Sequence, residues 1–208
     1  MKKYFERLGK KSKKAFEKKI DKDTKNRVLT HYALSINKYR KLILLQNKKD
    51  IDYAKKIGLK SNFISRLELD LNKINAIVNS IKSILKLKDP TNKILEQWKR
   101  PNGLKIKKVS VPIGVIGIIY ESRPNVTSDV SCLCFKSGNC VILKGGSEAY
   151  FTNKILSNLF RRSLKICKVD PNYVQFINIK NRKVVDYILS KMTKYIDIII
   201  PRGGKNLV

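Results

Sequence analysis

Between residues 111 and 200 the sequence alternates short apolar runs with longer helical stretches, and this alternation is the feature that most constrains the fold. The apolar runs cover residues 114–119, 140–143, 173–177 and 196–200. Helical stretches cover about residues 127–136, 149–167 and 182–192. Short apolar strands that alternate with helices predict a parallel sheet covered on both faces, as in a doubly wound, Rossmann-like α/β fold.

The segment before this alternation predicts helices. Apolar residues recur at helical spacing from about residue 4 to 47 and again from 67 to 85, which is the pattern of amphipathic helices. Gly58 interrupts the pattern between the two segments. The pair Asp89-Pro90 ends the second one, because a residue before proline is pushed out of helical geometry.

Two strand-like runs, 94–98 and 104–111, flank the pair Asn102-Gly103. Asn-Gly favours a tight β-hairpin, since both turn positions tolerate positive φ. We therefore expect a helical part over residues 1–90, a hairpin over 91–111 and a Rossmann-like part over 112–208.

The formal charge of +30 raises the possibility of a nucleic-acid partner. The excess is spread along the chain and consists of 36 lysines against 10 arginines, without a basic stripe interleaved with stacking aromatics. Biased codon usage explains such lysine enrichment, so we rank nucleic-acid binding last. The longest apolar run, residues 111–120, falls short of the roughly 20 residues of a spanning helix, which argues against a membrane partner.

The chain has four cysteines, Cys132, Cys134, Cys140 and Cys167, and one histidine. The N-terminus MKKYFERLGKKSKKAF has no apolar signal segment, so we expect a cytoplasmic protein with reduced thiols. The spacing gives no clamp of metal ligands, and we predict no metal site. Buried, alanine-like packing is the expected role of all four thiols.

Ligands of open parallel sheets bind beyond the carboxyl ends of the strands, in the loops that follow them. The loop after Leu143 reads Lys144-Gly145-Gly146-Ser147, and it leads into a helix N-terminus where free N–H groups favour phosphate. This loop lacks the GxGxxG spacing of a dinucleotide fingerprint. A tight turn without ligand remains the alternative.

Two longer motifs carry a family resemblance. The segment VSVPIGVIGIIYESRPNVTSDVSCLCFKSGNCVILKGGSE starts at Val109, and DIIIPRGG starts at Asp197. Both resemble motifs of the γ-glutamyl phosphate reductases, a branch of the aldehyde dehydrogenase superfamily that acts in proline biosynthesis. Members of that family are about twice as long, and their nucleophilic cysteine lies downstream of the second motif. The resemblance thus implies a truncated chain that lacks the nucleophile.

The resemblance implies NADPH as cofactor. It assigns Lys144 to the adenosine ribose, with Gly145, Gly146 and Ser147 beside it. A basic lysine next to a hydroxyl, with no carboxylate before Glu148, suits NADPH better than NADH. The loop Arg202-Gly203-Gly204 would lie on the pyrophosphate and nicotinamide side, with a surface salt bridge as the alternative role of Arg202.

The resemblance also implies a substrate-facing loop after residue 119. Asn125 matches an asparagine that stabilises the oxyanion of a tetrahedral intermediate, and Arg123 would pair with a carboxylate or acyl phosphate of L-glutamyl 5-phosphate. Helix capping is the other reading of Asn125, with Thr127 or Ser128 as further candidate caps.

For the full-length family the implied activity is reduction of L-glutamyl 5-phosphate to L-glutamate 5-semialdehyde by a homo-oligomeric enzyme. In the superfamily the hairpin contributes to the oligomer. We expect this chain alone to lack that activity. The alternatives are an NADPH-binding half that needs a separate C-terminal half, and a decayed remnant.

Overall fold

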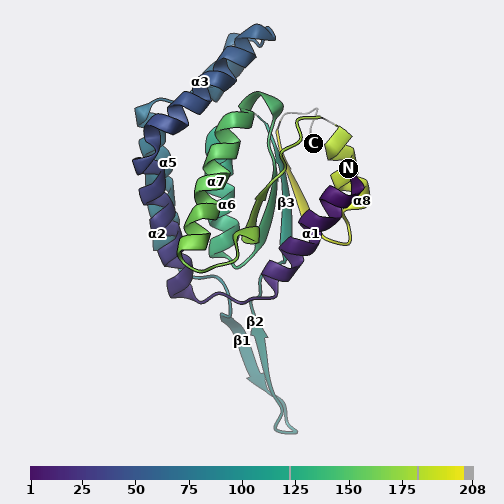
Figure 1. The fold of residues 1–208 in the computed structure, drawn as a ribbon. Helices are drawn as coiled ribbons and strands as arrows, with labels where there is room; N and C mark the ends of the chain where they lie inside the picture. The colour runs from purple at the N-terminus through teal and green to yellow at the C-terminus, as the bar shows by residue number, and fades with distance from the viewer. Residues whose placement is uncertain (122, 182, 204–208) are drawn as a thin grey trace.

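The structure is a computed structural model and describes residues 1–121, 123–181 and 183–203 (Figure 1). Five helices come first: α1 Lys2–Phe16, α2 Lys22–Lys38, α3 Arg40–Lys56, α4 Ser61–Leu67 and α5 Leu71–Lys86. The hairpin strands are β1 Ile94–Lys99 and β2 Lys105–Val109. The alternating part contains β3 Val115–Tyr120, α6 Pro124–Lys136, β4 Cys140–Lys144, α7 Tyr150–Ile166, β5 Val174–Phe176, α8 Lys183–Lys191 and β6 Ile198–Arg202.

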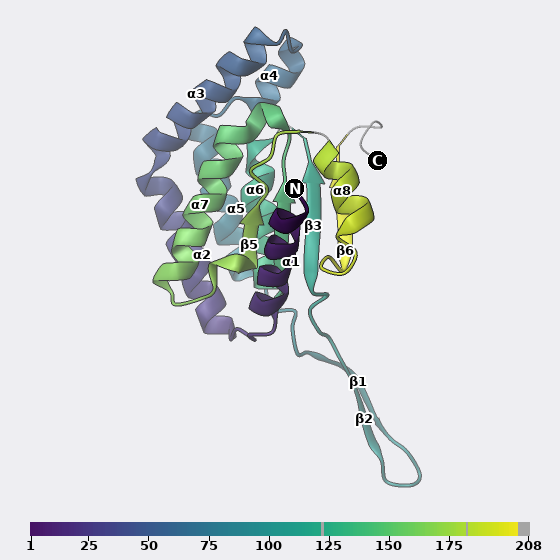
Figure 2. The ribbon, with the colours of Figure 1, turned by 45° about the vertical axis from the view of Figure 1, so that its right-hand side comes forward.

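The sheet confirms the predicted doubly wound α/β fold. Its four strands are parallel and lie in the order β5-β4-β3-β6. Helices α6 and α7 cover one face and α1 covers the other (Figures 1 and 2). The strand order reverses between β3 and β6, which makes the ends of these two strands the topological switch point.

Helices α1, α2, α3 and α5 contribute to the same hydrophobic core as the sheet, whereas Leu67 of α4 belongs to a smaller cluster with Ala54 and Ala149. In the outer helix α2, the buried Tyr32 ring lies 4.7 Å from the ring of Phe160 on α7, and Ser128 donates to the Tyr32 hydroxyl at 3.0 Å. Helix α1 is fixed to the opposite face, where Gln175 of β5 donates to the Leu8 carbonyl at 2.7 Å. Periodicity alone predicts helices here but not their partners.

The hairpin extends away from the body of the protein (Figures 1 and 2). Every residue of β1 is exposed, and Trp98 faces Ile106 across the antiparallel pair. The predicted turn pair behaves differently from our expectation: Gly103 has a φ of +85°, whereas Asn102 has no positive φ and accepts from the Leu104 N–H at 3.2 Å. The connection is therefore longer than a two-residue turn.

The elements differ from the predicted ranges mainly at their ends. Helix α6 begins at Pro124 rather than near residue 127, because proline is favoured in the first turn. Strand β5 is shorter than predicted, since Pro171–Tyr173 form a 3-10 turn. Within the described ranges, no helix combines the length and apolar character that crossing a membrane would require.

Candidate functional site

The carboxyl ends of β3, β4 and β6 meet at one edge of the sheet. Ile119 of β3 pairs with Lys144 on one side and with Pro201 on the other. The next residue, Tyr120, pairs with Arg202. The three loops that the sequence singled out therefore start side by side at the switch point, where ligands of such sheets bind.

Lys144 is a buried cation at this edge. Only 6% of the residue is exposed, and its ammonium donates to the Gly145 carbonyl at 2.9 Å. Burial lowers the pKa of Lys144, and the nearby charge of Glu148 partly offsets that effect. An ammonium has three donors, and among the described residues Gly145 takes one of them, so two remain for a ligand hydroxyl or phosphate.

The two glycines of this loop differ in how closely other protein atoms pack against them. A Cβ at Gly145 would lie 2.4 Å from the Asn153 amide nitrogen and 3.0 Å from the Tyr120 ring. A Cβ at Gly146 would lie 2.1 Å from one carboxylate oxygen of Glu148, whose other oxygen accepts from the Ser147 hydroxyl at 3.3 Å. Packing alone accounts for a glycine at position 145, and the expectation that the loop lets a ligand approach its backbone stays a prediction. It also follows that a carboxylate does lie against this loop.

The N-terminus of α7 is occupied by a carboxylate from α3. Asp50 accepts from the Phe151 N–H at 3.0 Å and from the Thr152 N–H at 2.7 Å, and the Thr152 hydroxyl donates to it as well. Burial raises the pKa of Asp50, and these hydrogen bonds oppose the rise. The prediction of free N–H groups for phosphate at this helix end is wrong for these two positions.

The loop after β6 offers an exposed arginine. Arg202 ends the strand, its carbonyl accepts from the Glu121 N–H at 3.3 Å, and Gly203 follows it at the surface. Gly204, the third residue of this predicted contact, lies outside the described residues. Asp197, the first residue of the DIIIPRGG motif, lies at the opposite end of the sheet. Its carboxylate accepts from the Val115 N–H at 2.7 Å.

The loop after β3 brings the predicted substrate residues to the start of α6. Arg123 is exposed and is the N-cap residue, without a side-chain cap. Asn125 lies in the first turn, and its amide donates to Asp129 at 3.0 Å. The capping reading of Asn125 is therefore wrong. Thr127 and Ser128 lie inside the helix and bond to other partners.

The orientation of the Asn125 amide follows from its partner. An ionised carboxylate only accepts hydrogen bonds, so the nitrogen of Asn125 faces Asp129. Ser80 of α5 donates to the other oxygen of Asp129 at 2.9 Å. Within the described residues the second hydrogen of the Asn125 amide has no protein acceptor, so it remains available to a ligand.

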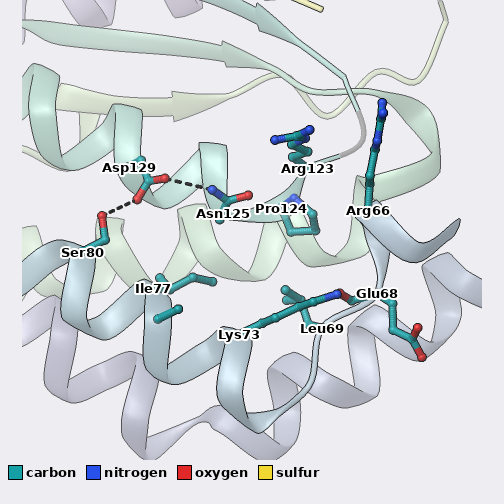
Figure 3. A pocket seen from close by; sticks show the side chains of 11 residues that line it. Arg66, Glu68, Leu69, Lys73, Ile77, Ser80, Arg123, Pro124, Asn125 and Asp129 are labelled. Atoms are coloured by element: carbon teal, nitrogen blue, oxygen red, sulfur yellow. Dashed lines mark hydrogen bonds between the residues drawn. The ribbon is translucent and has the colours of Figure 1, made fainter. Parts of the chain in front are cut away.

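These side chains line a pocket of about 290 Å³ between α6 and the link from α4 to α5 (Figure 3). That volume is near the lower end of small-molecule sites, roughly 300–1,000 Å³. The polar and charged residues of its wall are Arg66, Glu68, Lys73, Ser80, Arg123, Asn125 and Asp129. The sequence pointed to Arg123 and Asn125 but missed the contribution of α4 and α5, which no local pattern indicates.

A buried chain of hydrogen bonds connects β3, α6 and α7 at this edge of the sheet. The Tyr120 hydroxyl lies 2.6 Å from the Thr127 hydroxyl, which donates to the side-chain amide oxygen of Asn153 at 2.8 Å. The Asn153 amide nitrogen is fully buried and has no hydrogen-bond partner in the described structure. This chain ties β3, α6 and α7 together behind the Lys144 loop.

The four thiols are poor nucleophiles in this setting. Burial raises the pKa of Cys132 and Cys140, and it raises the pKa of Cys134 to about 12. Burial also raises the pKa of the half-buried Cys167. A catalytic thiolate requires the opposite shift. Among the described residues, no group of three His, Cys, Asp or Glu side chains is arranged to hold a metal ion.

Known proteins share this arrangement. The chain is 41% identical over 208 residues to the γ-glutamyl phosphate reductase of Clostridium tetani, covering 99% of this chain and 48% of the relative. It is 42% identical over 184 residues to that of Petrotoga mobilis, covering 88% and 44%. The chain is homologous to the γ-glutamyl phosphate reductases. It spans about half the length of the relatives it matches. No protein-family model matches it.

Solved structures support the homology to γ-glutamyl phosphate reductases. The enzyme of Thermotoga maritima superposes with a TM-score of 0.94 at 35% identity, covering 98% of this chain and 49% of that one. The enzyme of Saccharomyces cerevisiae gives 0.89 at 28% identity, covering 97% and 52%. A probable aldehyde dehydrogenase of Listeria monocytogenes, at 12% identity and a TM-score of 0.72, shares the fold over 97% of this chain and 42% of its own.

Proposed function

We propose that these residues form the cofactor-binding half of an NADPH-dependent γ-glutamyl phosphate reductase. The complete enzyme would reduce L-glutamyl 5-phosphate to L-glutamate 5-semialdehyde and phosphate in cytoplasmic proline biosynthesis. The observation that carries the proposal is the meeting of the Lys144, Arg123 and Arg202 loops at one edge of the sheet, in a chain homologous to these reductases.

Within this proposal, the Lys144 loop holds the adenosine ribose and Arg202, Gly203 and Gly204 lie toward the pyrophosphate. Two free donors on the buried Lys144 ammonium support a hydroxyl-rich ligand. The Asp50 carboxylate at the start of α7 argues against a phosphate at that helix end. When bound, NADPH supplies the hydride of the reduction.

The preference for NADPH over NADH rests on charge. Lys144 is cationic and Ser147 offers a hydroxyl, both of which favour a 2′-phosphate. Glu148 opposes it, since its carboxylate lies against Gly146. We propose that Glu148 turns away when the 2′-phosphate binds and gives up its hydrogen bond from the Ser147 hydroxyl.

Asn125 would stabilise the oxyanion that forms when a thiolate attacks the acyl phosphate. Its remaining amide hydrogen is the donor for that role. Because burial raises the pKa of the cysteines in this chain, we propose that the attacking thiol comes from outside these 208 residues.

Two exposed apolar surfaces favour assembly with further polypeptide. On the edge strand β6, Ile198 is 42% and Ile200 is 43% exposed, and on the hairpin Trp98 is 44% exposed. Exposed apolar strands favour pairing with additional strands. We therefore propose two partners for these strands: a separately encoded second half of the enzyme, and further copies of the protein in a homo-oligomer built through the hairpin. A decayed remnant predicts a chain that fails to fold or bind cofactor.

The experiment is reductase turnover measured by NADPH oxidation with L-glutamyl 5-phosphate. The chain is assayed alone and after addition of the remaining half of the Clostridium tetani relative. We expect turnover only in the mixture, and the same rate with Cys134→Ser or Cys167→Ser. Loss of turnover in a folded Cys134→Ser or Cys167→Ser chain would overturn the assignment of the thiol.

A further inference from the structure

A second pocket lies along the edge of the sheet at β5, the last of the described strands on that side. Figure 2 shows β5 between α7 and α1, and residues of these two helices and of both ends of β5 line the pocket. Its volume is about 190 Å³. Sites for whole small molecules have volumes of roughly 300–1,000 Å³, so this pocket suits a small chemical group rather than a complete nucleotide.

This pocket is separate from the cofactor loops at the carboxyl ends of the strands. Its two α7 residues, Asn158 and Arg161, lie roughly 12–16 Å along the helix from its first residue, Tyr150. Neither the Lys144 loop nor Arg202 contributes to its wall. A ligand in this pocket would therefore bind at a different place from the proposed cofactor.

The residues that line the pocket include three cations, Arg7, Lys11 and Arg161, and no carboxylate. By contrast, the pocket beside α6 and another near the start of α2 each include two carboxylates. None of the three cations forms a salt bridge within the described part of the chain. Arg7 and Lys11 lie four residues apart on α1, where like charges repel each other. A bound anion would offset that repulsion.

Arg161 is a half-buried charge with unused hydrogen-bond donors. Its Nη1 donates to the Pro171 carbonyl at 2.7 Å and to the Val174 carbonyl at 2.6 Å, which fixes the guanidinium against β5. The Nε and Nη2 atoms carry three further N–H donors, and these have no acceptor among the described residues. Burial lowers the pKa of Arg161, and the charge of Asp170 partly offsets that effect. A desolvated guanidinium of this kind favours an anion with several acceptor oxygens.

Amide side chains add neutral donors to the same wall. Asn158 lies one turn before Arg161 on α7, and Asn178 follows β5. Neither side chain forms a hydrogen bond with another described residue. The pocket therefore offers donors from α1, α7 and the end of β5.

We propose that this pocket binds a phosphate group. A phosphate monoester carries about −1.5 to −2 charges at pH 7 and three acceptor oxygens that point in different directions. It can accept hydrogen bonds from both helices and from β5 at once, whereas a carboxylate offers two oxygens in one plane. This inference is independent of the proposed function, because it uses none of the residues assigned to the cofactor or the substrate.

The test measures binding of inorganic phosphate to the 208-residue chain by calorimetry, with sodium chloride added to keep the ionic strength constant. Glycerol 3-phosphate, a phosphate monoester, and acetate, a carboxylate, are the other two probes. We expect saturable binding of both phosphates and much weaker binding of acetate. Tighter binding of glycerol 3-phosphate would identify a phosphorylated small molecule as the ligand, and tighter binding of inorganic phosphate would identify the free ion.

Variants of α1 assign the contacts without disturbing the core, since both side chains are exposed. Arg7→Gln and Lys11→Gln should each weaken phosphate binding about three- to fivefold, and the double variant about tenfold. The matched control is the double variant Lys10→Gln and Lys14→Gln. It removes the same charge at the same spacing from exposed positions of α1 outside the pocket, and it should change the affinity less than about twofold.

A further variant, Arg161→Gln, should weaken phosphate binding about tenfold or more, because the guanidinium supplies charge-assisted hydrogen bonds. This change also removes the two hydrogen bonds to backbone carbonyls, so thermal unfolding is compared with that of the wild type. The α1 variants test the proposal even where Arg161→Gln reduces stability.

Three results would overturn the proposal. The first is equal affinity of the two double variants, which would mean that phosphate only screens the positive charge of the chain. The second is binding of acetate as tight as that of phosphate. The third is loss of phosphate binding in Lys144→Met with none in the α1 double variant, which would place the phosphate at the cofactor loop. Absence of NADPH binding in a chain that passes these tests would contradict only the proposed function.

Discussion

The amide nitrogen of Asn125 lies 3.0 Å from the carboxylate of Asp129, one turn further along α6. This contact fixes which way the amide faces, and it leaves one hydrogen for an acceptor in front of the helix. A residue predicted from a resemblance to stabilise an oxyanion thereby acquires a defined orientation, because an ionised carboxylate accepts hydrogen bonds but cannot donate them.

The first prediction concerns turnover of the assembled reductase. Asn125→Ala removes the amide donor and should lower kcat by about 10²–10³-fold with little change in NADPH affinity. Asn102→Ala at the hairpin tip, far from the switch point, is the control and should leave kcat unchanged. An Asn125→Ala enzyme with unaltered kcat would remove Asn125 from the mechanism.

The second prediction concerns the Asp50 cap of α7. Asp50→Asn should lower the free energy of unfolding by about 1–2 kcal/mol, since an amide offers one acceptor oxygen where both oxygens of Asp50 accept hydrogen bonds from α7. The control is Asp52→Asn. Asp52 is exposed and lies two residues after Asp50 on α3, so the free energy of unfolding of this variant should stay within about 0.5 kcal/mol of the wild type.

The raised pKa of Asp50 adds a pH dependence to that comparison. The folded chain binds the proton of Asp50 more tightly than the unfolded chain, so this group contributes stability as the pH falls. The advantage of wild type over Asp50→Asn should therefore grow between about pH 7 and about pH 4 in urea unfolding followed by circular dichroism. An advantage that shrinks on acidification would contradict the burial of this carboxylate.

The third prediction separates the two glycines of the Lys144 loop. Gly145→Ala places a methyl group against the Asn153 amide and the Tyr120 ring, and it should lower the free energy of unfolding by about 1–3 kcal/mol. Gly146→Ala meets only the end of the Glu148 side chain, which can turn away, and should cost less than about 1 kcal/mol. Equal losses in thermal unfolding would show that packing does not explain Gly145.

The fourth prediction concerns thiol reactivity. Cys132, Cys134 and Cys140 are buried, whereas Cys167 is half-buried. Titration of the native chain with a thiol reagent should modify Cys167 first, and Cys167→Ser should remove the fast phase. A fast phase that persists in the Cys167→Ser chain would mean that one of the buried thiols is accessible.

The sequence predicted the alternating half of this fold well, because the spacing of apolar residues and the glycines and prolines between elements are local features of the chain. The buried strands β3 and β4 and the helix α7 lie close to the predicted ranges. It did not predict that α1 covers the second face of the sheet, since the contact of Gln175 with Leu8 joins residues that are distant in the chain.

The same distinction explains what the sequence missed at the site. The resemblance pointed to Arg123, Asn125 and Lys144, which lie at or just beyond the carboxyl ends of β3 and β4. Asp50 and Arg66 come from helices whose local pattern is that of any amphipathic surface helix, and only tertiary packing brings them to the edge of the sheet. Asp129 did carry a local signal, its position four residues after Asn125 on the same helix.

NADPH binding by the purified 208-residue chain tests the central claim most directly. Titration followed by NADPH fluorescence should show saturable binding that is tighter than for NADH. Lys144→Met, which keeps the length of the side chain but removes its charge, should weaken binding at least tenfold. The account would be contradicted by a folded chain that binds neither cofactor. Equal NADPH affinity of the wild-type chain and the Lys144→Met variant would contradict it as well.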